Sequence, residues 1–389
     1  MIHKKTIEKL LLILTLTIMS NQLNGQAASG KYSKFNIMAE FKGHYGFLYS
    51  HHLELDRFQA HYPAFELSIE QATWGAKRWE AEYAYPIIGL SLWYSQLGGF
   101  EEIGSAIALY PFINFPIVYD KKQSLNFRLG LGLGYLTNYF HRTANFKNFA
   151  IGSHINVAGS ISVEYRRKLS KSVTISGGVG LTHFSNGATK TPNYGLNIIT
   201  ANVGVSAFLR KPNPAFDKKI LPRLYPFEFD GRKDLDIEFS FSYAGKDMTE
   251  QFGKRFNVYS VYINVLKRVS YKSRFGGGVD LVYDESDKYM MNFNGNEDVT
   301  KIQTVKPGIS GVYELVVNRL RFMFNFGFYL YTLEKSEGTV YQRLTLKYYF
   351  IDQLFAHIVL NTNWGRAEYV GFGLGYKLNF VYKRKIKHL

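Results

Sequence analysis

A histidine and a serine stand two residues apart in the segment His183-Phe184-Ser185-Asn186-Gly187. A serine hydroxyl is a weak nucleophile until a neighbouring base takes its proton, and histidine is the base most often used. In a β-strand, residues two apart point to the same face. If this segment is a strand, the spacing predicts that His183 is the base for a nucleophilic Ser185, which is the chemistry of acyl-ester cleavage.

A catalytic histidine also needs a third group that fixes its tautomer and orientation. Asn197 is the candidate, because alternation in the next segment places it on the apolar face of that segment. Directly opposed residues of a hairpin lie about 5 Å apart at Cβ. We therefore expect Asn197 to accept a hydrogen bond from His183, and the side chain of Asn186 and the backbone N–H of Gly187 to donate to the oxyanion.

The segment that carries this motif has the period-two pattern of a β-strand with two unlike faces. The residues that share a face with the histidine and the serine are apolar: Val173, Ile175, Val179 and Leu181. The same alternation recurs in 125–135 and 370–382. In a membrane barrel the apolar face meets lipid and the polar face meets a wet lumen. The substrate would then be a lipid that approaches from the membrane.

A soluble sandwich would place the two faces the other way round, and the composition favours the membrane barrel. The chain of 389 residues is 16% aromatic, with 29 Tyr, 31 Phe and 35 Gly. Membrane barrels carry aromatic girdles at both interfaces. Residues 1–27 combine a basic start, a short apolar run and small residues, which indicates a signal peptide. We predict an all-β protein, a transmembrane antiparallel β-barrel in the outer membrane of a Gram-negative cell.

The alternating segments number about 12–16, with sixteen as the best count. Eight lie in 34–210 and the others in 234–383. The proline-rich segment 211–233 is expected to be a linker or a long turn, since proline does not fit a central strand. One closed barrel, or an eight-stranded barrel with a second unit, fits this pattern. We favour one closed barrel, because an open sheet edge in lipid leaves backbone groups unpaired.

The charge of the chain bears on its partners. A formal net charge of +16 suits anionic lipid headgroups and would also suit nucleic acid. Export through the inner membrane argues against nucleic acid, so membrane lipids are the expected partners. The pattern carries no signal for an oligomeric state.

A metal site is the alternative suggested by His51-His52 with Glu54 and Asp56 nearby. Adjacent side chains on a strand point to opposite faces, so the two histidines could not chelate from a strand. We expect no metal and no cofactor. The chain has no cysteine, which excludes disulfides and a lipoprotein anchor.

The motif around Ser185, continued by Pro192-Asn193 and Gly195, resembles that of the outer-membrane lipid A deacylases, also called acyloxyacyl hydrolases. The resemblance covers 34–210 and implies an eight-stranded barrel with a Ser-His-acid triad. It implies His183 as base and Ser185 as nucleophile, with Asn197 at the position of the acid. The site is also similar to that of outer-membrane phospholipase A, whose third member is an asparagine. Neither family accounts for the second half of the chain.

These observations lead to a serine esterase that removes an ester-linked acyl chain from lipid A or lipopolysaccharide. Two alternatives stay open: an outer-membrane phospholipase A, and a non-catalytic, porin-like barrel.

Overall fold

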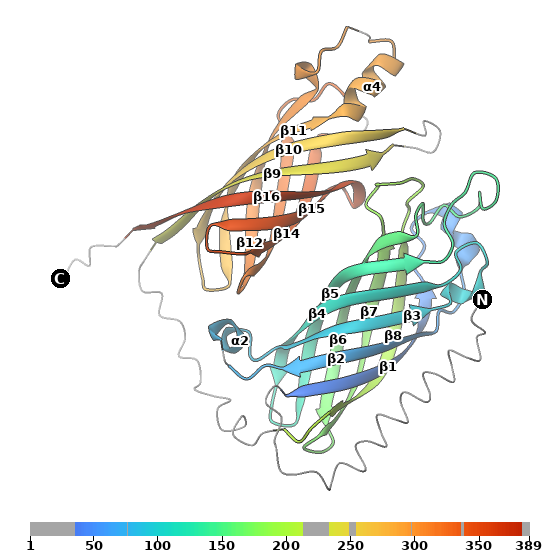
Figure 1. Cartoon of the computed structure of the whole chain (residues 1–389), viewed down its shortest axis with the longest axis vertical. Helices are drawn as coiled ribbons and strands as arrows, with labels where there is room; N and C mark the ends of the chain where they lie inside the picture. Colours follow the sequence, from blue (N-terminus) through green and yellow to red (C-terminus); the bar gives the residue numbers. More distant parts are fainter. Residues whose placement is uncertain are drawn as a thin grey trace, which may run out of the picture.

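In a computed structural model, the described residues are 36–75, 77–212, 233–248, 254–296, 298–335 and 338–382. They form sixteen antiparallel strands in two closed barrels of eight (Figure 1). The all-β barrel fold and the count of sixteen strands are thereby confirmed. The preference for one closed barrel is wrong, because β1 pairs with β8 and β9 pairs with β16, so each half closes on itself.

Two predicted segments fall outside this description. The expected signal peptide, 1–27, lies outside the described residues, and so does 213–232, most of the proline-rich segment. No helix among the described residues is long and apolar enough to cross a membrane.

The first barrel is a meander in which each strand pairs with the next. Its strands are β1 (Ile37–Leu48), β2 (Ala64–Ala72), β3 (Ile87–Ser95), β4 (Ala106–Tyr119), β5 (Gln123–Leu136), β6 (Ile155–Lys168), β7 (Val173–Ser185) and β8 (Leu196–Phe208). Short helical turns lie in three of the connections: η1 (Leu53–Phe58), α2 (Arg78–Glu82) and η2 (Leu97–Gly99).

The second barrel repeats the meander. Its strands are β9 (Lys233–Asp247), β10 (Arg255–Arg268), β11 (Ser273–Asp284), β12 (Val305–Val317), β13 (Leu320–Tyr329), β14 (Val340–Tyr349), β15 (Leu354–Asn363) and β16 (Arg366–Tyr382). Helix α4 (Glu285–Phe293) and the turn η3 (Ile302–Thr304) lie between β11 and β12.

Large apolar side chains face outward from both barrels, as the alternation predicts for strands in lipid. Leu133 on β5, Val203 on β8 and Leu374 on β16 are each more than 60% exposed, at 66%, 71% and 67%. The strand neighbours of Leu133 and Leu374 are glycines, and Asn202, which precedes Val203, is buried in the lumen. A soluble sandwich would bury the apolar face, so this arrangement is the one that a lipid solvent stabilises.

The lumen of the first barrel is filled by paired charges. Arg166 Nη2 lies 2.9 Å from Glu70 Oε2, and Arg128 bridges Glu66 and Glu164. Buried charges are tolerated when they are paired and hydrogen-bonded. Eight-stranded barrels have an interior that side chains can fill. This filled lumen gives no support to the porin-like alternative.

A similar network fills the second lumen. Arg343 Nη1 lies 2.8 Å from Asp280 Oδ2, and Arg321 Nη1 lies 2.9 Å from Glu314 Oε1. All four of these side chains are buried.

The two barrels touch at both rims. Where β7 and β9 end, the backbone N–H of Asp247 donates to the carbonyl of Ala188 at 2.8 Å. At the opposite rim, the hydroxyl of Tyr83, which follows α2, donates to the carbonyl of Val316 at 2.8 Å. Each rim of the first barrel therefore contacts the corresponding rim of the second. In this arrangement the exposed apolar surfaces of the two barrels can lie in one bilayer.

Candidate active site

The candidate base and its partner face each other across the β7–β8 hairpin. His183 and Asn197 are directly opposed in the register of the two strands. His183 Nδ1 lies 2.6 Å from Asn197 Oδ1. Because a carbonyl oxygen only accepts, Nδ1 must carry the proton in this bond. The other ring nitrogen, Nε2, then has a free lone pair, which is the tautomer that a general base requires.

The strand geometry turns this pair outward. Phe184 is fully buried and packs against Trp93 inside the barrel, with ring centroids 5.5 Å apart. Since neighbours on a strand point to opposite faces, the side chains of His183 and Ser185 project away from the lumen. Val179 continues the same face and is 60% exposed. The buried phenylalanine thus anchors the end of β7 and presents the two polar side chains to the outside.

The hydroxyl of Ser185 is held by the loop that follows it. Its Oγ accepts a hydrogen bond from Asn193 Nδ2 at 2.8 Å and another from the backbone N–H of Gly187 at 3.1 Å. Within the described part of the chain, no hydrogen bond joins Ser185 to His183. The hydroxyl accepts twice, so its own proton is left to donate. Catalytic hydrogen bonds are often long or misaligned without substrate and tighten in the complex.

Asn186 holds the loop together. Its side-chain amide donates to Ser153 Oγ at 3.0 Å and to the Lys190 carbonyl at 2.8 Å, and its backbone N–H donates to Asn193 Oδ1 at 3.0 Å. Both amide protons of Asn186 are therefore engaged within the loop. Of the two predicted oxyanion donors, only the N–H of Gly187 is directed at Ser185 Oγ.

Asn193 contacts Ser185, and the strand pattern did not predict this contact. It lies in the β7–β8 loop, where period-two alternation does not apply. The only signal was its place in the Pro192-Asn193 continuation of the motif. Its amide nitrogen touches Ser185 Oγ because the loop folds back over the end of β7.

Gly195 closes the loop over the histidine ring. It has a positive φ of 78°, and a Cβ at this position would lie 3.0 Å from His183 Cε1 and 3.1 Å from the Phe184 carbonyl oxygen. A glycine is therefore needed both for the backbone conformation and for the space that the imidazole occupies.

The histidines between β1 and η1 also reach the site. His51 Nδ1 lies 3.0 Å from Asn197 Nδ2, and the His52 ring stacks on Tyr194 with centroids 4.2 Å apart. Burial, His51 and Arg366 of the second barrel lower the pKa of His52. Among the residues that the structure describes, no three metal-ligating side chains gather at one point. The sequence pattern suggested these histidines as part of a polar loop or, less favoured, as metal ligands, and it gave no link to Asn197.

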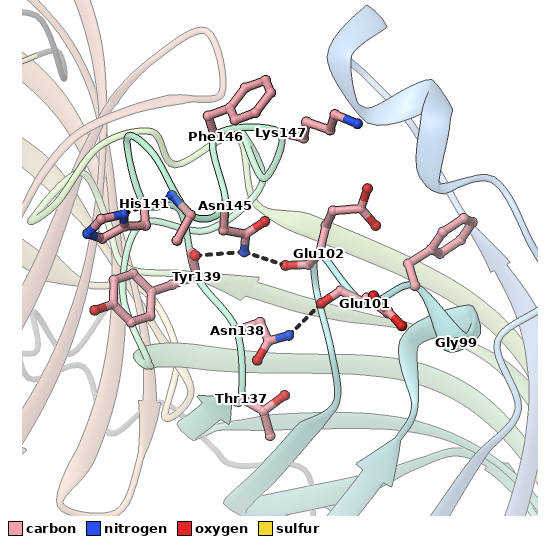
Figure 2. Close-up of a pocket in the computed structure, with 12 residues that line it drawn as sticks. Gly99, Glu101, Glu102, Thr137, Asn138, Tyr139, His141, Asn145, Phe146 and Lys147 are labelled. Carbon is pink, nitrogen blue, oxygen red and sulfur yellow. Dashed lines mark hydrogen bonds between the residues drawn. The ribbon is translucent and has the colours of Figure 1, made fainter.

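A cavity of about 1220 Å³ opens at the same rim, between the loops 99–102 and 137–147 (Figure 2). Its lining is mixed, with the rings of Tyr139 and Phe146 beside Glu101 and Glu102. Figure 2 shows Asn138 and Asn145 bonded to the loop backbone rather than directed into open space. Lys190 Nζ, from the β7–β8 loop (186–195), lies 4.9 Å from the centre of the Tyr139 ring. The cavity therefore borders the candidate site.

Family models match both halves of the chain. Residues 64–206 match "Lipid A 3-O-deacylase (PagL)", and residues 235–380 match "Acyloxyacyl hydrolase, C-terminal domain". The chain belongs to the PagL-like family. The expectation that neither related family accounts for the second half is wrong, because the second PagL-like model covers the strands from β9 to β16.

Other comparisons add little to this assignment. A search of curated proteins finds no match to the chain. Among solved structures, OccAB4 of Acinetobacter baumannii is 12% identical with a TM-score of 0.23, over 90% of this chain and 99% of that chain. An outer membrane channel of Pseudomonas putida F1 is 7% identical with a TM-score of 0.21, over 92% and 100%. With TM-scores this low, these two structures support no conclusion about the function of this chain.

Proposed function

We propose that this chain is an outer-membrane serine esterase that removes an ester-linked acyl chain from lipid A. The observation that carries the proposal is the hydrogen bond from His183 Nδ1 to Asn197 Oδ1, on the outward face that also bears Ser185. An esterase with this orientation meets its substrate in the membrane, where the ester bonds of a lipid lie beside the barrel wall. Membership of the PagL-like family supports lipid A as the substrate.

The proposed reaction follows the chemistry of serine hydrolases. Ser185 Oγ attacks the ester carbonyl carbon while His183 Nε2 takes the hydroxyl proton. The tetrahedral oxyanion collapses, the bond between the former carbonyl carbon and the sugar oxygen breaks, and the imidazolium gives its proton to the leaving sugar alkoxide. Water, deprotonated by His183, then attacks the acyl-enzyme, which releases the fatty acid and restores Ser185.

The oxyanion is proposed to receive hydrogen bonds from the backbone N–H of Gly187 and the side-chain amide of Asn193. Both groups are already directed at Ser185 Oγ, next to the carbon that the serine would attack. Donors in such a position act most strongly where water is excluded. Asn186 stays a predicted donor, and a shift of the loop would have to release its amide from Ser153 and Lys190.

Asn197 supports this chemistry as a neutral residue. It fixes the tautomer of His183 through the 2.6 Å hydrogen bond but adds no charge to balance an imidazolium. The similarity to outer-membrane phospholipase A, which also has an asparagine here, makes phospholipid hydrolysis the second candidate function.

The proposed location is the outer membrane, with the ends of β7 and β8 at the outer leaflet. With the N-terminus in the periplasm, odd-numbered strands run outward, and the motif ends the seventh strand. Lipopolysaccharide occupies that leaflet, so Ser185 would lie at the depth of its ester bonds.

Mass spectrometry of lipid A and of phospholipids from Gram-negative cells that express the chain tests the proposal. We expect lipid A to lose one acyl chain, and phospholipids to stay intact. Ser185→Ala should abolish this loss of an acyl chain. The control Ser124→Ala, near the start of β5 at the rim opposite to Ser185, should retain it. Lysophospholipid with intact lipid A would favour the phospholipase, and acyl loss that survives Ser185→Ala would remove this serine from the mechanism.

A further inference from the structure

An asparagine in the third position of a triad creates a problem that a carboxylate does not have. The two ends of its amide have nearly the same shape, but only the oxygen accepts a hydrogen bond. If Asn197 were rotated by half a turn, its NH₂ group would face His183 Nδ1. The imidazole would then keep its lone pair at Nδ1 and its proton at Nε2, where no proton could be taken from Ser185. A productive site must hold the amide in one orientation.

The contact that can do this lies on the far side of the amide. Asn197 Nδ2 is 3.0 Å from His51 Nδ1. A neutral imidazole nitrogen without a proton accepts a hydrogen bond, and only the NH₂ end of the amide can donate one. With the nitrogen bound to His51, the oxygen of Asn197 is directed at His183, at 2.6 Å.

The place of His51 follows from the closure of the first barrel. Strand β1 pairs with β8, and the backbone N–H of Tyr49 donates to the carbonyl of Asn197 at 2.8 Å just after β1 ends. His51 follows two residues later, and its ring contacts that of His52 at 4.6 Å between centroids. His52 in turn stacks on Tyr194 of the catalytic loop. The imidazole of His51 is thus held near Asn197 by the backbone bond of Tyr49 and by ring contacts that run through His52 to Tyr194.

We propose that His51 is a positioning residue that selects the productive orientation of the Asn197 amide, so that the site works as a relay from His51 through Asn197 and His183 to Ser185. This inference rests on the proposed function. It also explains how this chain could use the amide of Asn197 at the position where the lipid A deacylases that it resembles have an acidic residue. A carboxylate presents an oxygen in either orientation and needs no such selection.

The relay makes a prediction that a purely structural role for His51 does not make. His51→Phe keeps the ring but removes the acceptor, and should matter only while residue 197 is an amide. In the full chain in detergent micelles, we expect His51→Phe to slow the labelling of Ser185 by a fluorophosphonate about tenfold, the effect of about one hydrogen bond. In the Asn197→Asp background, the same change should alter the rate less than about twofold.

The controls separate base activation from folding and from substrate binding. His61→Phe, a histidine of the same rim whose ring stacks on Tyr45, should leave the labelling rate near that of the unchanged chain. Thermal unfolding of His51→Phe should match that of the parent. On lipid A, its kcat should fall about as much as the labelling rate, with KM changed less than about twofold.

An equal loss in both backgrounds, or no loss in the parent chain, would overturn the role of His51. If Asn197→Asp labels too slowly to measure, Asn197→Glu serves as the carboxylate background and the same two results decide. Failure of the proposed function is distinguishable, because it would appear as lipid A that stays intact with the parent chain, or as lipid A cleavage that persists in Ser185→Ala. A chain that needs Ser185 but is indifferent to His51→Phe would contradict the relay alone.

Discussion

His183 donates a hydrogen bond from Nδ1 to Asn197 Oδ1 at 2.6 Å, and the two residues are opposed on the paired strands β7 and β8. The partner of the base therefore sits on a different strand, and the distance between them is set by sheet geometry rather than by a flexible loop. Preorganisation of this kind lowers the cost of holding the base in its reactive orientation.

Replacement of Asn197 by leucine keeps the size of the side chain and removes the acceptor. We expect kcat for acyl release to fall about 10–100-fold, because His183 loses the group that fixes its tautomer. KM should change little, since the amide faces the imidazole and not the lipid. A steady-state assay of fatty acid release measures both values, and an unchanged kcat would show that Asn197 has no part in the reaction.

Gly195→Ala tests how closely the loop fits the histidine. The new Cβ would press on the imidazole of His183, so we expect a loss of both stability and activity. Gly99→Ala is the matched control, because Gly99 also has a positive φ, of 84°, but its Cβ would meet nothing within 4 Å. Both variants should lose about 1 kcal/mol or somewhat more in stability. Equal esterase activity in the two variants would contradict the contact with the base.

Asn193→Ala removes one of the two groups directed at Ser185 Oγ. If its amide binds the oxyanion, kcat should fall about 100-fold or more. Asn138→Ala is the control, since Asn138 also bonds to loop backbone at this rim, through the Glu101 carbonyl, but has no contact with Ser185. Esterase kinetics on purified protein would compare them, and a similar small effect for both would assign Asn193 to loop structure only.

The second barrel is expected to support the catalytic loop. Asp247 Oδ2 lies 3.4 Å from both the backbone nitrogen and the hydroxyl of Thr191, and Val370 packs where a side chain at Gly187 would collide with it. We expect Asp247→Ala to lower kcat a few-fold by loosening the loop, as for a lost hydrogen bond of about 1 kcal/mol. Asp234→Ala, at the other end of β9, should leave kcat unchanged. Equal kcat values for Asp247→Ala and Asp234→Ala would show that the β7–β8 loop does not depend on the contact between Asp247 and Thr191.

Much of the first barrel follows from local pattern. The alternation around Val179 and Val203 predicts both the strands and the face that is exposed, because a period of two is a local property of the chain. The pairing of β7 with β8 also follows, since the loop 186–195 joins two consecutive strands, and the alternation places His183 and Asn197 on the same face. The outward orientation of the candidate site was therefore predictable from a few residues.

Other features depend on contacts that are distant in sequence. Whether β8 closes on β1 or continues into β9 is decided by pairing between strands far apart in the chain, and alternation is identical in both cases. The contacts of Asn193 and His51 come from loops, whose conformation has no simple period. The sequence indicated His51 only as a loop residue or a possible metal ligand, because its neighbour in the structure, Asn197, lies 146 residues further along the chain.

The most direct test of the central claim is to identify the labelled residue by peptide mass spectrometry, after the purified full chain reacts with a fluorophosphonate that blocks lipid A cleavage. One phosphonyl group on Ser185, and no labelling of His183→Ala, is the predicted result. A label on another residue, or full lipid A cleavage by a chain whose Ser185 is phosphonylated, would contradict the assignment of this serine as the nucleophile.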